Sequence, residues 1–126
     1  MSEQSYKELA AVTKAMAHPT RLHILEILAQ DDACVCHLTA ILNQRQPYIS
    51  QQLMVLRDAG LVTDRRDGVM VYYSLSCPCV GDAVKMMHNL LRATGNEMSF
   101  PQVPEAPVDG CPCPKCKGRR ASPDEA

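Results

Sequence analysis

The order of the hydrophobic patterns in residues 34–75 constrains the fold of this chain most strongly. Apolar side chains recur at the three-to-four-residue spacing of a helix twice in succession, with a polar turn between the two segments. Two short strand-like runs follow, and the dipeptide Asp67-Gly68 between them is a strong hairpin-turn signal. The pattern therefore predicts two short helices and then a hairpin, over residues 34–42, 47–59, 61–65 and 69–75.

Three further helices are predicted around this unit from apolar stripes, over residues 5–17, 21–30 and 80–93. Pro19 disfavours helix at the residue before it, so it separates the first two of these helices, and Thr20 is placed to cap the second. Two short helices followed by a hairpin describe a winged helix-turn-helix. We therefore expect a mainly α fold with a small β-hairpin.

The 126-residue chain is the size of one domain, and its composition changes near Gly95. Residues 1–94 carry the helical and strand patterns, so they are expected to form the folded domain. Residues 95–126 are rich in Pro, Gly, Cys and charge, which predicts a flexible tail of irregular structure.

Charge and hydropathy exclude several classes of protein. The formal net charge of −1 argues against a protein that coats nucleic acid, so any DNA contact needs a local basic patch. No stretch approaches the roughly 20 apolar residues that span a bilayer, and nothing reads as a signal peptide. We expect a cytoplasmic protein with no membrane partner. A phosphate-binding loop and a Ser, His and Asp constellation are both missing from the sequence, so an enzyme is not expected.

The second helix of the helix-turn-helix unit is expected to enter the major groove of double-stranded DNA. Its amide and hydroxyl side chains suit base edges and phosphates, and nearby arginines supply local positive charge for backbone contacts. The alternative is that these residues form a solvated helix face. The candidate DNA-binding residues are Arg45, Gln46, Tyr48, Ser50, Gln51, Gln52, Arg57, Arg65 and Arg66.

Four blocks in consecutive elements resemble the ArsR/SmtB family of metal-sensing repressors. They are AHPTRLHIL at residues 17–25, CVCHL at 34–38, QPYISQQLMVLRDAGLV at 46–62, and DG with YYSL between 67 and 75. The resemblance covers roughly residues 6–93. It implies a homodimeric winged helix that binds a palindromic operator and leaves the DNA when it binds its inducer.

The resemblance further implies that the first and last helices, about residues 6–17 and 80–93, form the dimer interface. The apolar stripe of the last helix fits that role, although packing within the same chain is the alternative. The stripe consists of Val80, Val84, Met87 and Leu91.

The seven cysteines fall into three groups, and their grouping is more informative than their number. An odd count without a secretion signal, in a chain with ample helical pattern, argues against a disulfide scaffold and favours metal binding or redox sensing. The candidate metal ligands are Cys34 and Cys36, Cys77 and Cys79, and Cys111, Cys113 and Cys116.

Cys34-Val35-Cys36 resembles the motif of the arsenite- and cadmium/lead-responsive members of the family. Thiolates are soft ligands that select ions such as As(III), Cd(II) or Pb(II), and a helix N-terminus favours the thiolate form. Side chains at i and i+2 of a regular helix point to nearly opposite sides. Joint binding by this pair therefore requires either a distorted helix start or its non-helical first residues.

The motif departs from those of its relatives in the third ligand. Thr39 stands where the arsenite pattern carries a third cysteine, and residues 1–33 lack the N-terminal cysteines of the cadmium/lead pattern. Asp82 and His88 do not reproduce the zinc pattern of the last helix, and both are expected on the surface. A three-thiolate site must recruit sulfur from elsewhere. His37, in the same motif, is a modest further ligand candidate.

Cys77-Pro78-Cys79 is the first candidate source of that sulfur. Pro78 favours an extended Cys77, and in an extended chain the side chains at i and i+2 share a face. The pair could form its own site, complete one with Cys34 and Cys36, or act across protomers. A rigid strand-to-helix junction with incidental cysteines is the alternative.

The tail cysteines are the second candidate source. Three thiolates within six residues suit a trigonal ion such as As(III) or Pb(II), whereas a closed Zn(II) site needs a fourth ligand. The tail could also hand an ion to the core or fold over it as an arm.

These features predict a repressor that binds operator DNA as a dimer and is released when As(III), Cd(II), Pb(II) or Zn(II) binds cysteine thiolates. A redox or persulfide sensor on the same scaffold is the second hypothesis. A metal buffer or chaperone without regulation is the third, and only the tail favours it.

Overall fold

The computed structural model describes residues 3–96 and 98–104 of the chain. Within these residues it contains five helices and three short strands. In chain order they are α1 (Glu3–Met16), α2 (Pro19–Gln30), β1 (Ala33–Cys34), α3 (Val35–Leu42), α4 (Gln46–Asp58), β2 (Val62–Asp67), β3 (Met70–Leu75) and α5 (Pro78–Ala93). No helix in this part of the chain is long and apolar enough to cross a membrane.

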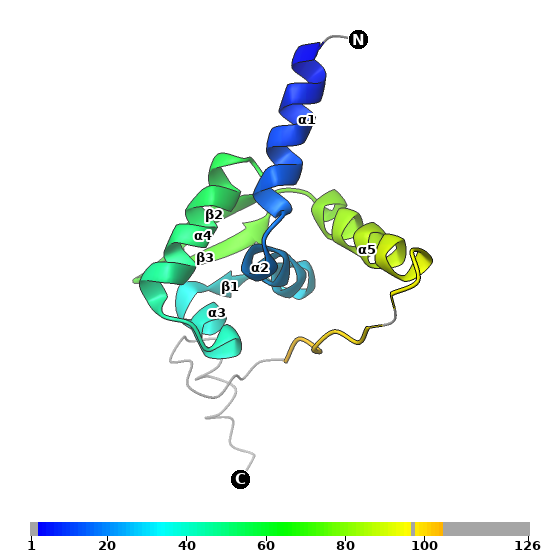
Figure 1. Cartoon of the computed structure of the whole chain (residues 1–126). Coiled ribbons are helices and arrows are strands. Elements are labelled where there is room, and N and C mark those ends of the chain that lie inside the picture. Colours follow the sequence, from blue (N-terminus) through cyan, green and yellow to red (C-terminus); the bar gives the residue numbers. More distant parts are fainter. Residues whose placement is uncertain (1–2, 97, 105–126) are drawn as a thin grey trace.

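α2 lies at the centre of the molecule and separates two groups of elements (Figure 1). α3, α4 and the sheet lie on one side of it, and α5 lies on the other. α1 projects from the body, and its buried residues, Ala15 and Met16, are at its C-terminal end. The helix-turn-helix unit and α5 are therefore connected by packing on α2 and by the chain that joins β3 to α5.

The core is aliphatic and is built mainly from α2, α3 and α4, which confirms the helical stripes predicted for these segments. Burying one such side chain contributes about 1.5–3 kcal/mol relative to leaving it exposed. Because the three helices share this core, it fixes the angle between α3 and α4. The largest fully buried side chains of the three helices are Ile24, Leu25, Leu38, Ile49, Leu53 and Leu56.

The sheet has one strand more than the sequence predicts. The hairpin of β2 and β3 is confirmed, and Gly68 in its turn has a φ of +64°, which favours glycine. β1 adds to the other edge of β3, so the strand order is β1-β3-β2. Cys34 is therefore a strand residue and not a residue of the third helix. Two residues are too few to show the alternating pattern of a strand, so β1 is recognised only by its pairing with β3.

Two helix starts differ from the prediction. α2 is capped by His18, whose Nδ1 accepts a 3.2 Å hydrogen bond from the backbone N–H of Thr20, and not by Thr20 itself. The Thr20 hydroxyl instead lies 3.1 Å from the hydroxyl of Tyr48 on α4. α5 begins two residues earlier than predicted, because Cys77 caps it and Pro78 suits the first helical position.

Candidate DNA-binding surface and thiol sites

The turn between α3 and α4 sets the geometry of the helix-turn-helix unit. Asn43 closes α3 in the left-handed conformation, with a φ of +53°, which asparagine adopts more readily than most residues. Pro47 lies in the first turn of α4, as the sequence predicts. Ile49 and Leu53 then hold one face of α4 against the core, and its other faces carry the candidate DNA contacts.

The predicted DNA-binding residues at the start of α4 lie at or near the surface. Arg45, Gln46 and Gln51 are exposed, whereas Tyr48 and Ser50 are half-buried. Arg45 precedes the helix, so its charge lies beside the first turn of α4. This end of α4 can present amide, hydroxyl and guanidinium groups together.

Gln52 does not belong to that surface. Its side chain is 6% exposed, and its Oε1 accepts a 2.8 Å hydrogen bond from Nη1 of Arg21 on α2. Arg21 also donates from Nε to the carbonyl oxygen of Ala15. Position 52 shares a helical face with Ile49 and Leu56, so it faces the core, although the polarity of Gln52 suggests a surface position. We therefore remove Gln52 from the candidate DNA contacts.

The remaining arginines differ in their partners. Nη1 of Arg57 lies 3.0 Å from Oδ2 of Asp64, an ion pair that joins α4 to β2. Nη1 of Arg65 lies 2.8 Å from Oδ2 of Asp32. Such exposed pairs contribute about 1 kcal/mol or less, so a phosphate can replace the carboxylate at little cost. Arg66 is exposed on the same strand as Arg65.

The sulfurs of Cys34 and Cys36 converge at the start of α3. Cys34 caps the helix in an extended conformation, with φ −85° and ψ 167°, and Cys36 lies in the first turn. Their Sγ atoms are 2.7 Å apart, and the backbone N–H of His37 donates to Sγ of Cys34 at 3.4 Å. Of the two geometries the sequence allows, the pair uses the non-helical first residue. The helix itself is not distorted to bring the sulfurs together.

Cys34 also begins a row of side chains that crosses the sheet. Cys34 lies opposite Tyr72, and Tyr72 lies opposite Arg65, so the three share one face of the sheet. The Arg65 guanidinium lies over the Tyr72 ring, 5.1 Å from its centroid, and pairs with Asp32 near the start of β1. We call this arrangement the Cys34–Tyr72–Arg65 row. It joins a candidate ligand to a candidate DNA contact.

The described residues do not complete a metal site around this pair. Among them, no group of three or more Cys, His, Asp or Glu side chains could hold an ion. Thr39, at the position of the missing third cysteine, donates its hydroxyl to the carbonyl oxygen of Cys36 at 2.8 Å. His37 is only 6% exposed. Any third ligand must come from outside the described residues, from a rearrangement or from a second protomer.

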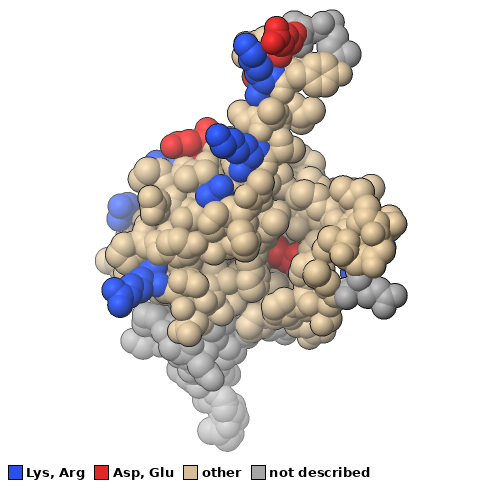
Figure 2. Space-filling model, in the orientation of Figure 1, with Lys and Arg blue, Asp and Glu red and all other residues tan. Residues whose placement is uncertain are grey.

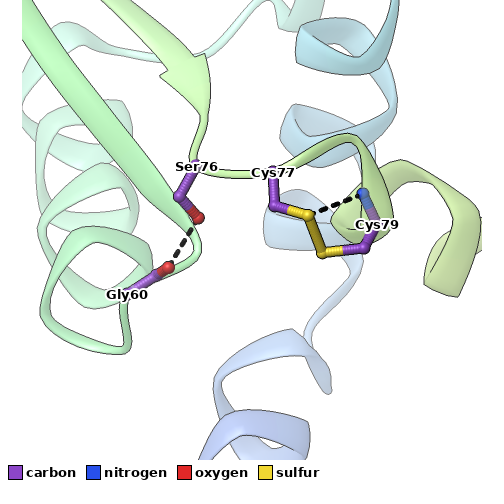
Figure 3. The surroundings of a disulfide bond; sticks show 4 residues. All are labelled: Gly60, Ser76, Cys77 and Cys79. Atoms are coloured by element: carbon purple, nitrogen blue, oxygen red, sulfur yellow. Dashed lines mark hydrogen bonds between the residues drawn. A yellow bond between two sulfur atoms is a disulfide. The ribbon is translucent and has the colours of Figure 1, made fainter.

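Cys77 and Cys79 form a disulfide in this structure (Figure 3). Cys77 is extended, with φ −159° and ψ 141°, which confirms that Pro78 directs the two side chains to one face. A disulfide sulfur is not a thiolate ligand, so in this state the pair cannot bind an ion. Cys77 also follows Tyr72 by five residues, about 16 Å of extended chain, so it does not join the Cys34 site. Cys111, Cys113 and Cys116 lie outside the described residues.

His88 is not the surface residue that the sequence predicts. It is half-buried, with Nε2 2.8 Å from Oε1 of Glu26 on α2, and its ring lies 4.1 Å from that of Phe100. These residues line a cavity of about 570 Å³ between α2, α5 and residues 100–101. Glu26 carries no sequence signal for this contact, because its partner is 62 positions further along the chain. Asp82 is exposed, as predicted.

The predicted dimer stripe on α5 is divided between the core and the surface. Val80 and Val84 are 7% and 4% exposed and belong to the core of the same chain, which corrects the assignment of these two. Met87 and Leu91 are half-buried. Other apolar side chains of α1 and α5 are exposed instead, and the face of α5 that is visible in Figure 2 carries little charge. They are Tyr6, Leu9, Met86 and Leu90.

Comparison with known proteins agrees with this architecture. Residues 18–64 match the family described as "Bacterial regulatory protein, arsR family". The biofilm growth-associated repressor of Agrobacterium fabrum is 45% identical over 74 residues, which are 59% of this chain and 63% of that protein. An arsenical resistance operon repressor of Staphylococcus aureus is 33% identical over 84 residues, which are 67% of this chain and 81% of that protein.

Solved structures share the same fold. The crystal structure of Rv0081 from Mycobacterium tuberculosis has a TM-score of 0.69 and 37% identity, and the match covers 74% of this chain and 94% of that one. The homodimeric winged helix-turn-helix DNA-binding domain of Mb0332 from Mycobacterium bovis has a TM-score of 0.67 and 25% identity, covering 79% and 97%. This chain therefore belongs to the ArsR family of DNA-binding transcriptional regulators and is not an enzyme.

Proposed function

We propose that this protein is a repressor that binds operator DNA as a homodimer and is released when a thiophilic ion binds Cys34 and Cys36. As(III) is the first candidate ion, and Cd(II) and Pb(II) are the others. The observation that carries the proposal is the 2.7 Å approach of the two sulfurs at the first turn of the helix-turn-helix unit. The name of the Staphylococcus aureus relative, an arsenical resistance operon repressor, supports As(III).

The chemistry of the donor set fits a soft ion in part. Two sulfurs converge from the cap and the first turn of α3, and thiolates prefer As(III), Cd(II) and Pb(II) to harder ions. A trigonal thiolate site needs one more sulfur than the described residues supply. Our proposal takes it from the tail group, Cys111, Cys113 and Cys116. Cys77 and Cys79 of a second protomer are the alternative donors once their disulfide is reduced.

The proposed route from ion to DNA runs through both neighbours of Cys34. A displacement of Cys34 moves the start of α3, which packs against α4 in the shared core. The same displacement disturbs the pairing of β1 with β3 and hence the Cys34–Tyr72–Arg65 row. Both α4, which would read bases, and the hairpin of β2 and β3 (the wing), which would contact phosphates, would then lose their DNA-binding geometry.

The proposed dimer is formed by α1 and α5. Their exposed apolar side chains, Tyr6 and Leu9 on α1 and Met86 and Leu90 on α5, have no function within one protomer's core. The homodimeric state of the Mycobacterium bovis domain supports this arrangement. A dimer places two copies of α4 against successive turns of the major groove, which suits a palindromic operator.

Fluorescence anisotropy with an operator duplex, obtained by selection from random DNA, tests the function. As(III) should release the duplex from the reduced protein. The Cys34→Ser, Cys36→Ser double variant should bind DNA equally well and remain bound when As(III) is added. X-ray absorption should report three sulfurs around As(III) in the full chain and two after deletion of residues 105–126. Failure of As(III), Cd(II) and Pb(II) alike to release DNA would reject the proposal.

A thiol-based redox or persulfide sensor is the second candidate function, because the structure contains the Cys77–Cys79 disulfide. It predicts that an oxidant releases DNA without any ion and that dithiothreitol reverses the release. The two functions use different cysteines and are compatible in one chain. A metal buffer without regulation receives no support from membership of a family of transcriptional regulators.

A further inference from the structure

The Cys77–Cys79 disulfide does not act as a structural staple. It closes a loop with only Pro78 between the two cysteines, so it removes very little conformational freedom from the unfolded chain. The aliphatic core is complete without it. Intracellular DNA-binding regulators also work in a reducing compartment, where disulfides are usually transient and serve catalysis or sensing. The bond therefore needs an explanation other than stability.

The two sulfurs are placed for reversible closure. Cys77 is half-buried against the core, and its Sγ accepts a 3.1 Å hydrogen bond from the backbone N–H of Cys79. Cys79 is exposed in the first turn of α5. Cys77 is extended here, and a residue before proline disfavours the helical conformation whatever the state of its sulfur, which favours both side chains on one face. An oxidant can therefore reach the exposed Cys79, and Cys77 lies close enough to react with it next.

The disulfide lies where three elements of the regulator meet (Figure 3). Ser76, next to Cys77, donates its hydroxyl to the carbonyl oxygen of Gly60 at 2.6 Å and its N–H to that of Leu61 at 3.0 Å. The end of α4, the end of β3 and the start of α5 are thus tied together.

The start of α5 also packs closely on α2. A Cβ at Gly81 would lie 3.2 Å from Cβ of Ala29 and 3.5 Å from Cδ1 of Leu75. The first turn of α5 therefore has little room to move without shifting α2 and β3.

We propose that Cys77 and Cys79 form a redox site, separate from Cys34 and Cys36, whose state sets the affinity of the repressor for operator DNA. Hydrogen peroxide is the oxidant. The Cys79 thiolate attacks one peroxide oxygen, the O–O bond breaks, and the released hydroxide takes a proton to become water. The Cys77 thiolate then attacks the resulting sulfenic sulfur, an S–S bond replaces the S–O bond, and a second water leaves. Two thiols are oxidised, and one peroxide is reduced to two waters.

The first measurement locates the reaction. Trypsin places both cysteines in the peptide of residues 67–85, which contains no other cysteine. After treatment of the reduced full-length protein with equimolar hydrogen peroxide, this peptide should be lighter by two hydrogen atoms. Dithiothreitol should restore its mass. A peptide that remains reduced would overturn the proposal.

The second measurement concerns function and rests on operator binding as proposed above. Oxidation should lower operator affinity by about fivefold or more, and the Cys77→Ser, Cys79→Ser variant should lose this change. Serine is a good helix N-cap, so the substitution at position 77 keeps the start of α5 intact, and a circular dichroism melt checks the fold. An unchanged affinity on oxidation, or a peroxide response that survives in this variant, would overturn the proposal.

Two reciprocal controls separate this site from the ion site. The Cys77→Ser, Cys79→Ser variant should still release DNA with As(III), whereas Cys34→Ser, Cys36→Ser should keep the peroxide response and lose the As(III) response. If As(III) fails with both proteins but peroxide acts through residues 77 and 79, only the proposed ion sensing fails. If peroxide acts only through Cys34 and Cys36, the redox site is misplaced.

Discussion

Cys34 lies opposite Tyr72 in the pairing of β1 with β3, so one residue of the thiol pair belongs to the same sheet as the β2–β3 hairpin. Tyr72 lies in turn opposite Arg65, whose guanidinium covers the ring. A candidate ligand residue and a candidate DNA-contacting arginine are thus separated by a single aromatic side chain. In the proposed function, the sheet is therefore a second route from the thiols to DNA, beside α4.

Tyr72 should be important for stability as well as for this connection. Its side chain is 7% exposed and packs against Cys34, so Tyr72→Ala leaves a cavity under the thiol pair. We expect a loss of about 3 kcal/mol in the free energy of unfolding, measured by urea denaturation. Val69→Ala, at a side chain that is 91% exposed at the tip of the hairpin, is the control and should change it by less than about 0.5 kcal/mol. Equal losses would contradict the burial argument.

The neighbouring arginines of β2 should have different functions. Arg66→Ala removes an exposed charge, so operator affinity should fall. The slope of log affinity against log salt concentration should become shallower by about 0.9 for each protomer of the dimer. Arg65→Ala should reduce affinity less, because Arg65 is paired with Asp32 and Tyr72, but it should alter the As(III) concentration that releases DNA. Anisotropy titrations at several salt concentrations measure both. Indistinguishable variants would show that the row plays no part in the response.

Gln51 and Gln52 offer a similar test on α4. Gln52→Ala leaves the half-buried Arg21 without its side-chain acceptor and should cost about 1–3 kcal/mol of folding free energy. Gln51→Ala, at an exposed position, should leave stability unchanged and reduce operator affinity. Denaturation and DNA binding, measured on both variants, separate the two effects. A stable Gln52→Ala protein with weakened, sequence-altered DNA binding would return Gln52 to the DNA-contacting set.

The dimer proposal predicts different results for two exposed apolar residues. Leu90→Glu on α5 should dissociate the dimer, because it places a charge in the proposed apolar interface. Val69→Glu changes a side chain that is 91% exposed at the tip of the hairpin, and it should leave the dimer intact. Sedimentation velocity at micromolar concentrations distinguishes the two. A dimeric Leu90→Glu protein would place the interface elsewhere.

The sequence by itself determines the features that arise from local interactions. The helical stripes locate all five helices, Asp67-Gly68 locates the hairpin turn, and Pro78 fixes the extended Cys77 that faces Cys79. In each case the responsible forces act within a few residues. The thiol motif and the unit that reads DNA are recognisable for the same reason.

Only the tertiary structure decides which of these residues face one another. β1 exists because Ala33 and Cys34 pair with a strand almost forty residues further along the chain, and that pairing takes Cys34 out of the helix. Gln52 is buried because Arg21, 31 residues away, supplies its hydrogen bond. Cys34 and Cys36 are brought together by an extended cap that sheet pairing holds in place. Such contacts depend on how distant segments pack, and no local period in the sequence encodes them.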